Sequence, residues 1–393
     1  MLAKTQSPKI LLVHNFYRQD AIGGEDLIFE QEKVGLQTLL GAHNVYTYTV
    51  SNDHLPLTLP LSLWFPLGHA LRVYRLIRQE GIQLVQIHNT VPQLTPFIAW
   101  VAQKAGAKVV QTLHNFRPWC LAGTLYKPTN PLCRDCYLQK SFWPGVVQKC
   151  YRQSRLQSLL LGLAYTWYQW WSPLKYIDKF IVLSKTQLHL LNTLGISSER
   201  CALKYNGIPP TTVQPIAPEQ KRGFIVVGRL EAAKGIELAL EAFLQSGLDV
   251  PFIVIGNGPL LAPLQQRYRQ PAIQFLGPLP YNETLEQIAQ ARYLIHPGLM
   301  QETFGLTLFD AMKVGTPVIG LNIGTRAEFI IPGRNGFQTE PSIEALSHGM
   351  LQAMQTENYA QLCQEARQYA GQFALKDMLD KQLQIYTQVL DAP

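Results

Sequence analysis

Residues 301–320 read QETFGLTLFDAMKVGTPVIG, a stretch that joins a glycine turn to a short helix and then to a strand. Gly305 permits a tight turn, the apolar spacing of LTLFDAMKV predicts a helix, and Gly315 marks its C-terminal stop. The free N–H groups at the start of such a helix attract phosphate or sugar oxygens without any charged side chain. This stretch therefore predicts a turn of an α/β domain at which an oxygen-rich ligand binds.

Two carboxylates, Glu302 and Asp310, lie on either side of Gly305. On an ideal helix, eight positions would separate them by about 12 Å and rotate them by about 80°. They are therefore too far apart to act as an acid–base pair on one atom. We expect them to hold opposite ends of an extended ligand such as a nucleotide-sugar, which has a sugar at one end, a ribose at the other and a diphosphate between.

Strand patterns alternate with helix patterns over most of the chain. Short apolar, β-rich runs precede segments long enough for helices, which is typical of parallel sheets covered on both faces. The runs are KILLVHN (9–15), GIQLVQIHN (81–89), AKVVQTLHN (107–115), DKFIVLS (178–184), RGFIVVGRL (222–230), VPFIVIGNG (250–258), IQFLG (273–277) and RYLIHPG (292–298). The pattern predicts an α/β protein with two Rossmann-like, doubly wound domains that face each other across a cleft.

The boundary between the two domains is predicted at a proline-rich segment, PPTTVQPIAPEQ (209–220), after which the alternation restarts. We therefore assign residues 1–208 to an N-terminal domain and residues 209–374 to a C-terminal domain. A final helix at about 375–393 has apolar residues at helical spacing and is expected to pack back on the first domain. The length of 393 residues agrees with two domains, because single cores stop growing below this size.

The net charge of +7 is unevenly distributed. Residues 1–208 carry 21 Lys and Arg against 10 Asp and Glu, whereas residues 209–393 carry 13 against 17. The two halves are thus +11 and −4, so the first favours an anionic partner: a phospholipid surface, a lipid-linked phosphate or a nucleic acid. A plain excess of solvated lysines explains the charge equally well, and no recognised module supports nucleic-acid binding.

Two segments bear on location in the cell. The N-terminal MLAKTQSPKILLVHN lacks the apolar core and cleavage site of a secretory signal, so we expect a cytoplasmic protein. Residues 156–174, LQSLLLGLAYTWYQWWSPL, are uncharged and place Leu and Trp at helical spacing, with flanking cations at Arg152, Arg155, Lys175 and Lys179. Polar residues within this segment argue against a membrane span. The pattern fits either an interfacial helix on an anionic membrane or a helix that packs within the fold.

Four of the six cysteines, Cys120, Cys133, Cys136 and Cys150, lie within 31 residues. A CxxC pair with two further thiols nearby has the ligand number of a structural zinc site. A disulfide pair and ordinary packing of the thiols are the alternatives, although six cysteines are too few for a disulfide scaffold in so long a chain. We expect such a site to brace a loop near the acceptor.

A second glycine-rich segment, VVGRLEAAKG (226–235), places two cations after a buried strand. Arg229 can bind a diphosphate bidentately and Lys234 can act as a point charge, although an ordinary surface pair would look the same. In IGNGP, Gly256 and Gly258 let the backbone approach a ligand closely, but this pattern also occurs in plain strand-to-helix turns.

Taken in order, these motifs resemble those of the retaining glycosyltransferases of family 4, which have the two-domain GT-B fold. The resemblance covers nearly the whole chain. The segments that carry it are IGGED (22–26), VVGRLEAAKGIELALEAF (226–243), ETFGLTLFDAMKVGTPVIG (302–320) and AEFIIPGRNGF (327–337).

The resemblance implies a role for each matching residue. Glu302 would contact hydroxyls of the donor sugar, and Asp310 would take the ribose diol. Arg229 and Lys234 would stabilise the departing nucleoside diphosphate. His114 matches the family histidine beside the donor sugar, although by residue type alone a structural role is equally good. The implied catalytic residues are Arg229, Lys234, Glu302 and His114, and the implied donor-binding residues are Gly23, Gly24, Gly228, Gly256, Gly258, Thr303, Phe304, Gly305, Leu306 and Asp310.

One position departs from the family pattern, because the second acidic residue is usually glutamate and Asp310 is one methylene shorter. Aspartate can still accept both ribose hydrogen bonds if the helix shifts slightly. A catalytically weak or inactive nucleotide-sugar-binding protein of the same fold is therefore the alternative. The sequence contains no Asp-x-Asp, which agrees with a mechanism in which cationic side chains and a helix end, rather than a metal cofactor, offset the diphosphate charge.

These inferences predict a retaining, metal-independent hexosyltransferase that uses a UDP- or GDP-sugar and a hydroxyl of a glycan or lipid-linked acceptor, in cell-surface polysaccharide or glycolipid synthesis. In the family chemistry the leaving phosphate oxygen takes the acceptor proton, so no side-chain base is needed and none is assigned to His114. A Rossmann oxidoreductase is disfavoured because no convincing GxGxxG follows the first strand. The sequence leaves the base, the hexose and the acceptor open.

Overall fold

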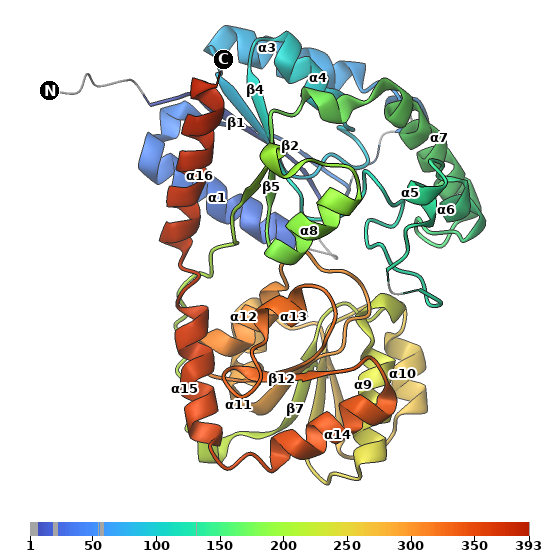
Figure 1. The fold of residues 1–393 in the computed structure, drawn as a ribbon, viewed down its shortest axis with the longest axis vertical. Helices are drawn as coiled ribbons and strands as arrows, with labels where there is room; N and C mark the ends of the chain where they lie inside the picture. Colours follow the sequence, from blue (N-terminus) through green and yellow to red (C-terminus); the bar gives the residue numbers. More distant parts are fainter. Residues whose placement is uncertain (1–6, 19–22, 54, 56–58, 131, 393) are drawn as a thin grey trace, which may run out of the picture. The chain divides into compact units, whose positions relative to one another are not determined.

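The structure is a computed structural model that describes residues 7–18, 23–53, 55, 59–130 and 132–392. Residues 1–6, which belong to the segment predicted to lack a secretory signal, and Ile22 of the IGGED motif lie outside the described residues. The chain divides into two units (Figure 1). Unit 1 contains residues 1–124, 134–207 and 376–393, and unit 2 contains residues 125–133 and 208–375. Each unit has a six-stranded parallel sheet with helices between the strands, so the predicted α/β fold is confirmed.

The sheet of unit 1 has the strand order β2-β1-β3-β4-β5-β6. The order reverses between β1 and β3, and in such sheets ligands bind beside the carboxyl ends of the strands at this switch point. The strands are β1 (Ile10–Phe16), β2 (Val45–Ser51), β3 (Leu84–Ile87), β4 (Lys108–Thr112), β5 (Lys179–Val182) and β6 (Cys201–Leu203). The helices are α1 (Gly24–Leu40), α2 (Leu59–Ser62), α3 (Leu67–Glu80), α4 (Phe97–Lys104), α5 (Asp135–Leu138), α6 (Trp143–Val147), α7 (Arg155–Trp171), α8 (Lys185–Thr193) and α16 (Leu375–Asp391).

The sheet of unit 2 has the order β12-β11-β10-β7-β8-β9, with its switch point between β7 and β10. The strands are β7 (Arg222–Val227), β8 (Phe252–Ile255), β9 (Ile273–Gly277), β10 (Ala291–His296), β11 (Val318–Leu321) and β12 (Gly336–Thr339). The helices are α9 (Ile236–Ser246), α10 (Leu261–Arg267), α11 (Tyr281–Gln290), α12 (Leu306–Lys313), α13 (Thr325–Phe329), α14 (Ile343–Met354) and α15 (Tyr359–Ala370). The polar ends of β7 and β10 therefore lie next to each other in this sheet.

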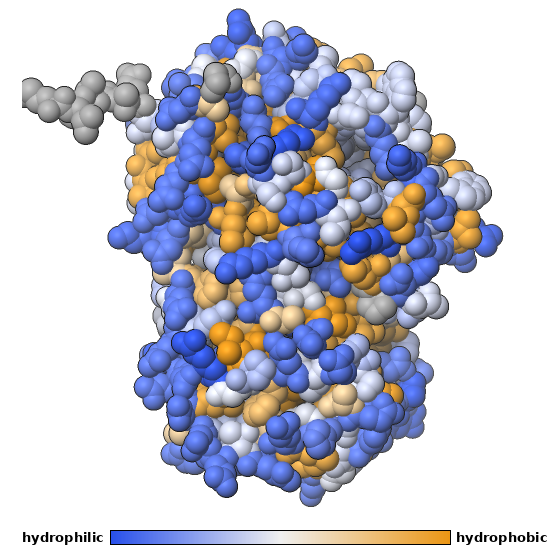
Figure 2. Space-filling model, in the orientation of Figure 1, coloured by the Kyte–Doolittle hydropathy of each residue, from blue (hydrophilic) through white to orange (hydrophobic). Residues whose placement is uncertain are grey.

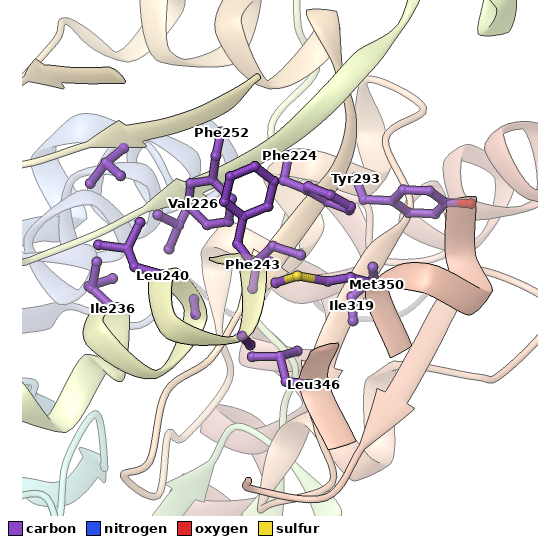
Figure 3. Close-up of a cluster of buried hydrophobic side chains, with 14 of the residues drawn as sticks. Phe224, Val226, Ile236, Leu240, Phe243, Phe252, Tyr293, Ile319, Leu346 and Met350 are labelled. Carbon is purple, nitrogen blue, oxygen red and sulfur yellow. The ribbon is translucent and has the colours of Figure 1, made fainter. Parts of the chain in front are cut away.

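The core of unit 2 explains why this switch point is firmly held. Figure 3 shows apolar side chains from the strands packed against side chains of α9 and α14. Phe224, Phe252 and Tyr293 from three strands are fully buried, and the Tyr293 hydroxyl donates to the carbonyl of Ala353 at 2.7 Å. Phe243 of α9 packs on Phe224 and Phe252. Such dense packing fixes the strands, so the loops at their carboxyl ends begin from a rigid base.

The units differ from the predicted domain ranges at two places. The division falls between residues 207 and 208, one residue before the predicted boundary. The grouping of α16 with unit 1 from Lys376 onward is not a difference, because this helix was assigned to the first domain. Residues 125–133 were assigned to the first domain but are grouped with unit 2. This segment is a short loop with an isolated antiparallel bridge between Lys127 and Asn130. It contains no hydrophobic repeat that a sequence pattern could detect.

Candidate functional site

The turn before α12 has the glycine-dependent geometry that the sequence predicted. Gly305 has a φ of +88°, in the left-handed region, and the helix begins at Leu306. Glu302 therefore lies in the loop after β10 and not on the helix. The ideal-helix separation of about 12 Å between Glu302 and Asp310 does not apply, because the left-handed residue interrupts the helix between them.

Glu302 is surrounded by three nitrogen-bearing side chains in unit 2. Its carboxylate lies 2.6 Å from Lys234 Nζ, 3.4 Å from His296 Nε2 and 4.0 Å from Arg326 Nη1. Burial raises the pKa of the Glu302 carboxyl, but the charge of Lys234, followed by His296 and Arg326, outweighs burial and holds that pKa well below its usual range. Burial lowers the pKa of His296 to about 4. Glu302 is thus a fixed negative charge beside a neutral imidazole.

Sequence reasoning found Glu302 and Lys234 but missed their ion pair and two neighbours, His296 and Arg326. His296 ends β10 directly before a proline and a glycine, which is a position where a polar side chain faces a ligand edge of the sheet. Arg326 is fully buried, and its Nε and Nη1 atoms have no hydrogen-bond partner among the described residues. A buried guanidinium with unused N–H groups next to Glu302 can donate hydrogen bonds to further oxygen atoms.

The second predicted cation, Arg229, has a different environment from Lys234. It follows Gly228 at the carboxyl end of β7, and its side chain is 59% exposed. The nearest carboxylate is Glu231, with its Oε2 atom 3.7 Å from Arg229 Nε. Arg229 therefore keeps most of its donors toward solvent, where an anionic group of a ligand can bind them.

Two glycines predicted to approach a ligand are required by the fold itself. A Cβ atom on Gly256 would lie 1.9 Å from the carbonyl oxygen of Gly228, and one on Gly258 would lie 2.4 Å from that of Leu230. The loops after β7 and β8 are therefore in direct backbone contact. This contact holds Arg229 and the following turn at the carboxyl ends of the strands.

Asp310 has two partners that the sequence did not predict. Tyr281 donates its hydroxyl hydrogen to Asp310 Oδ1 at 2.6 Å, and Lys313 Nζ lies 2.9 Å from the same oxygen. Burial, followed by the negative charge of Asp310, raises the pKa of the Tyr281 hydroxyl well above its usual range. The spacing of Lys313 three residues after Asp310 is a helical pair that could have been recognised. Tyr281 lies 29 residues away on α11 and carried no such signal.

The remaining residues of the signature separate into core and surface. Phe304 is 2% exposed and stacks on Phe309 at 4.5 Å between ring centroids, so its side chain belongs to the core of unit 2. Thr303, Gly305 and Leu306 are half-buried. A contact of Phe304 with a donor would have to come from its backbone.

Unit 1 contains the other predicted site residues. Gly23 directly precedes α1 as its N-cap, and its N–H donates to Asp26 Oδ2 at 3.1 Å, while His14 Nε2 lies 2.7 Å from Asp26 Oδ1. Gly24 is exposed. His114 follows β4, and its Nε2 atom lies 3.0 Å from Nδ1 of His88, a residue that sequence reasoning did not select. Both histidines come after apolar strands, which was the available signal.

The four clustered cysteines do not form a recognisable ligand set. Among the residues that the structure describes, no group of three or more His, Cys, Asp or Glu side chains is arranged to hold a metal ion. Cys133 belongs to unit 2, whereas Cys120, Cys136 and Cys150 belong to unit 1, and none of these described cysteines is in a disulfide. The zinc site stays a prediction.

Two models of known families match the chain. "Glycosyl transferases group 1" matches residues 211–373, and "Glycosyltransferase Family 4" matches residues 41–212, so that together they span residues 41–373. D-rhamnosyltransferase WbpZ of Pseudomonas aeruginosa is 32% identical over 129 residues, which are 31% of this chain and 32% of that protein. O-antigen chain mannosyltransferase C of Escherichia coli is 27% identical over 177 residues, 43% of this chain and 47% of that protein. The chain thus matches less than half the length of these relatives.

A solved structure supports the fold over a much longer range. HepE of Anabaena, solved in complex with UDP, superimposes with a TM-score of 0.66 at 16% sequence identity. The match covers 97% of this chain and 100% of the other. At this identity the likeness concerns the two-domain fold.

Proposed function

Because the chain belongs to glycosyltransferase family 4, we propose that it transfers a hexose from a nucleotide-sugar to a hydroxyl group, with retention of configuration and without a catalytic metal. The observation that carries this proposal is the Glu302 carboxylate, 9% exposed, which lies 2.6 Å from Lys234 Nζ in the loop before the N-terminus of α12. A fixed carboxylate accepts hydroxyl hydrogens of a sugar, and the helix end with adjacent cations receives a diphosphate.

The proposed chemistry uses the cations at the moment when charge grows. As the bond between the sugar and the diphosphate breaks, negative charge collects on the leaving phosphate oxygens. Lys234 and Arg229 face this charge, and preorganised cations of this kind lower the barrier. The leaving oxygen then takes the acceptor proton, so no side chain has to act as a base. On the family pattern we also assign donor contacts to His114, Gly23 and Gly24.

A second function is favoured by one observation. Asp310, the residue assigned to the ribose, already has Tyr281 and Lys313 as partners. A ribose diol would have to use the remaining lone pairs of the carboxylate or displace the tyrosine. A protein that binds a nucleotide-sugar weakly and does not turn it over is therefore the competing proposal.

The donor and acceptor classes are proposed from the relatives. HepE was solved with UDP, and the matched enzymes of Pseudomonas and Escherichia are named for rhamnosyl and O-antigen mannosyl transfer. We propose a UDP- or GDP-hexose as donor and a glycan or lipid-linked glycan as acceptor, in cell-surface polysaccharide or glycolipid synthesis.

A thermal-shift screen with UDP-, GDP- and ADP-sugars tests donor binding. A ligand at 100 times its Kd that binds only the folded protein adds about 2.7 kcal/mol to the unfolding free energy. The donor that raises the Tm should then release nucleoside diphosphate in the presence of an acceptor glycan. Binding without release of sugar would favour the competing proposal. Absence of a shift with every nucleotide-sugar would contradict both.

We also propose that unit 1 binds the surface of an anionic membrane from the cytoplasm. Among the described residues, no helix combines the length and hydropathy required to cross a bilayer. On α7, however, Leu156, Leu163 and Trp170 are exposed by 66%, 47% and 77%, and their spacing of seven residues puts them on one line along the helix. The ring centroid of Trp167 lies 5.2 Å from that of Trp170 and 5.8 Å from that of Phe65. An interfacial helix presents such a row to the lipid.

Neighbouring helices extend this apolar surface. Figure 2 shows apolar side chains interspersed with hydrophilic ones where α5, α6 and α7 lie in Figure 1. Further exposed apolar residues are Leu138, Trp143 and Val147, and, before and on α3, Phe65, Leu67 and Leu71. Residues 136–177 contain five Lys and Arg and no Asp or Glu. Each cation near an anionic bilayer contributes about 1 kcal/mol, so charge and apolar contact act together.

Sedimentation with vesicles tests the membrane proposal. The wild-type protein should sediment with vesicles that contain an anionic phospholipid and much less with neutral phosphatidylcholine vesicles. Leu163→Ser with Trp170→Ser should reduce binding about tenfold or more, because burial of such side chains contributes about 1.5–3 kcal/mol each. The matched control is Leu276→Ser, since Leu276 is an exposed leucine of unit 2. Equal loss of binding in both would contradict the assigned surface.

A further inference from the structure

A buried polar network in unit 1 connects the C-terminal helix α16 to His114. Gln382 Nε2 and the Tyr386 hydroxyl of α16 both donate to Gln86 Oε1 on β3. The Gln86 amide nitrogen lies 2.8 Å from Glu32 Oε2 and 3.0 Å from His88 Nε2. These residues are at most 3% exposed, so every hydrogen has to find its acceptor inside the protein.

The orientation of the Gln86 amide follows from its neighbours. Its oxygen faces two donors from α16. Its nitrogen faces Glu32, whose carboxylate is paired with the buried Lys204 and can only accept. The Gln86 amide nitrogen also lies 2.9 Å from Thr112 Oγ1. A reversed amide would put oxygen against the Glu32 carboxylate and nitrogen against two donors, so these neighbours favour the orientation seen in the structure.

This orientation determines which nitrogen of His88 carries a hydrogen. Burial lowers the pKa of both His88 and His114 well below the usual range, so each imidazole is neutral and has one N–H. A hydrogen on His88 Nε2 would point at the Gln86 amide group, which is itself a donor. The other oxygen near this atom, Glu32 Oε2 at 3.5 Å, is too distant to be preferred. The hydrogen of His88 is therefore on Nδ1.

The position of the hydrogen on His88 also determines which nitrogen of His114 carries a hydrogen. Nδ1–H of His88 donates across 3.0 Å to Nε2 of His114, which must be without hydrogen to accept it. The two rings lie nearly parallel, with an interplanar angle of 17°. The hydrogen of His114 is thus on its Nδ1 atom. Its Nε2 lone pair is occupied and cannot take a proton from an acceptor hydroxyl.

We propose that Gln86 and His88, oriented by Gln382 and Tyr386 of α16, are positioning residues that hold His114 in the Nδ1–H tautomer as a hydrogen-bond donor. The role of this donor in sugar transfer rests on the proposed function, whereas the tautomer itself does not. In the transferase, a neutral donor fixed in one orientation would bind a sugar oxygen without acting as a base.

The tautomer can be read directly in the wild-type protein without any donor or acceptor. The two nitrogens of a neutral imidazole differ strongly in 15N chemical shift according to which one carries the hydrogen. A long-range 1H–15N spectrum of the full chain labelled with 15N-histidine should show the His114 ring protonated on Nδ1 at neutral pH, with the assignment made from His114→Gln. Protonation of His114 on Nε2 would overturn the proposal.

Two substitutions of nearly equal size test the role of His88. His88→Asn keeps an N–H close to the position of Nδ1, whereas His88→Leu removes it. His88→Leu should give a mixture of His114 tautomers and lower kcat about tenfold with little change in KM, the loss expected for one hydrogen bond. His88→Asn should retain the tautomer and most of kcat. Equal spectra and equal kcat in both variants would contradict the proposal that His88 holds the tautomer of His114.

The contribution of α16 is tested by Gln382→Leu combined with Tyr386→Phe, which should also give mixed His114 tautomers. The matched control is Tyr168→Phe, because Tyr168 is a buried tyrosine of unit 1 whose hydroxyl bonds to Leu63, Trp64 and Thr95. A merely structural effect would lower stability in both and change the tautomer in neither, which would overturn the proposal. If no sugar is transferred by the wild-type protein, the proposed function fails. The spectra still show whether His114 is held in the Nδ1–H tautomer.

Discussion

Glu302→Gln is the most informative substitution, because it removes one charge while keeping the shape of the side chain. The wild-type carboxylate lies 2.6 Å from Lys234 and 4.0 Å from Arg326. Removing one partner of a fully buried ion pair costs about 3–5 kcal/mol. The Lys234 side chain is 29% exposed, so water recovers part of this loss, and we expect the unfolding free energy to fall by about 2–3 kcal/mol at neutral pH.

The pH dependence of this loss has a definite sign. The folded-state pKa of Glu302 is depressed below the ordinary value of 4.5. Its contribution to stability is therefore fully present above about pH 4.5 and is lost as the pH falls through the folded-state pKa. The difference between wild type and Glu302→Gln should be full at about pH 7 and should shrink at about pH 3.

Urea unfolding followed by two spectroscopic probes measures the change in unfolding free energy and shows whether it arises in unit 2, which contains Glu302. All seven tryptophans lie in unit 1, so their fluorescence follows that unit, whereas far-UV circular dichroism follows both. Glu302→Gln should shift the circular dichroism transition. The control Glu231→Gln should change the unfolding free energy by less than about 1 kcal/mol, because its pair with Arg229 is exposed. Equal shifts in the two variants, or a difference that does not shrink in acid, would refute the reasoning. In transfer assays, Glu302→Gln should lower kcat on the order of 100-fold while nucleoside diphosphate still binds.

Three further predictions concern the other site residues. Arg229→Ala and Lys234→Ala should each lower kcat on the order of 100-fold with a smaller change in donor affinity, and near-normal rates for both would remove the diphosphate assignment. Asp310→Asn should weaken binding of donor and free nucleoside diphosphate about tenfold, whereas Asp310→Glu should keep or improve it; calorimetry that finds no change in either case contradicts the ribose role. Elemental analysis of protein purified without chelator should find about one zinc, lost in Cys133→Ser with Cys136→Ser, and metal-free folded protein would refute the zinc site.

Most of the strands, though not β2, β6 and β12, could be predicted, because parallel strands buried on both faces are continuous apolar runs. Ile10, Leu11, Leu12 and Val13 of β1 are all fully buried, and their sequence reads as one such run. The boundary of unit 1 around residues 125–133 could not be predicted, because a short excursion without apolar periodicity leaves no pattern. The start of α12 was predicted through Gly305, since only a glycine adopts its backbone conformation easily.

The site residues were predicted one by one, whereas their pairings were not. Glu302 and Lys234 are 68 residues apart in sequence, and nothing local to either residue indicates the other. The switch point of the sheet brings the ends of β7 and β10 together, and only then does a carboxylate after one strand meet a lysine after the other. Arg326 lies still further along the chain in α13, and only in three dimensions is it visible that its Nε and Nη1 atoms have no hydrogen-bond partner among the described residues.

The helix α16 shows that a long-range polar contact can sometimes be recognised in the sequence. The apolar spacing of α16 predicts only that the helix packs on something. Two of its buried positions, Gln382 and Tyr386, carry polar atoms in a face that also buries Met378, Leu379, Ile385 and Val389. A buried polar group without a partner costs free energy, so a glutamine and a tyrosine one turn apart on such a face indicate a polar partner in the element beneath. That partner is Gln86 on β3, 296 residues before Gln382, and it leads directly to His88 and His114.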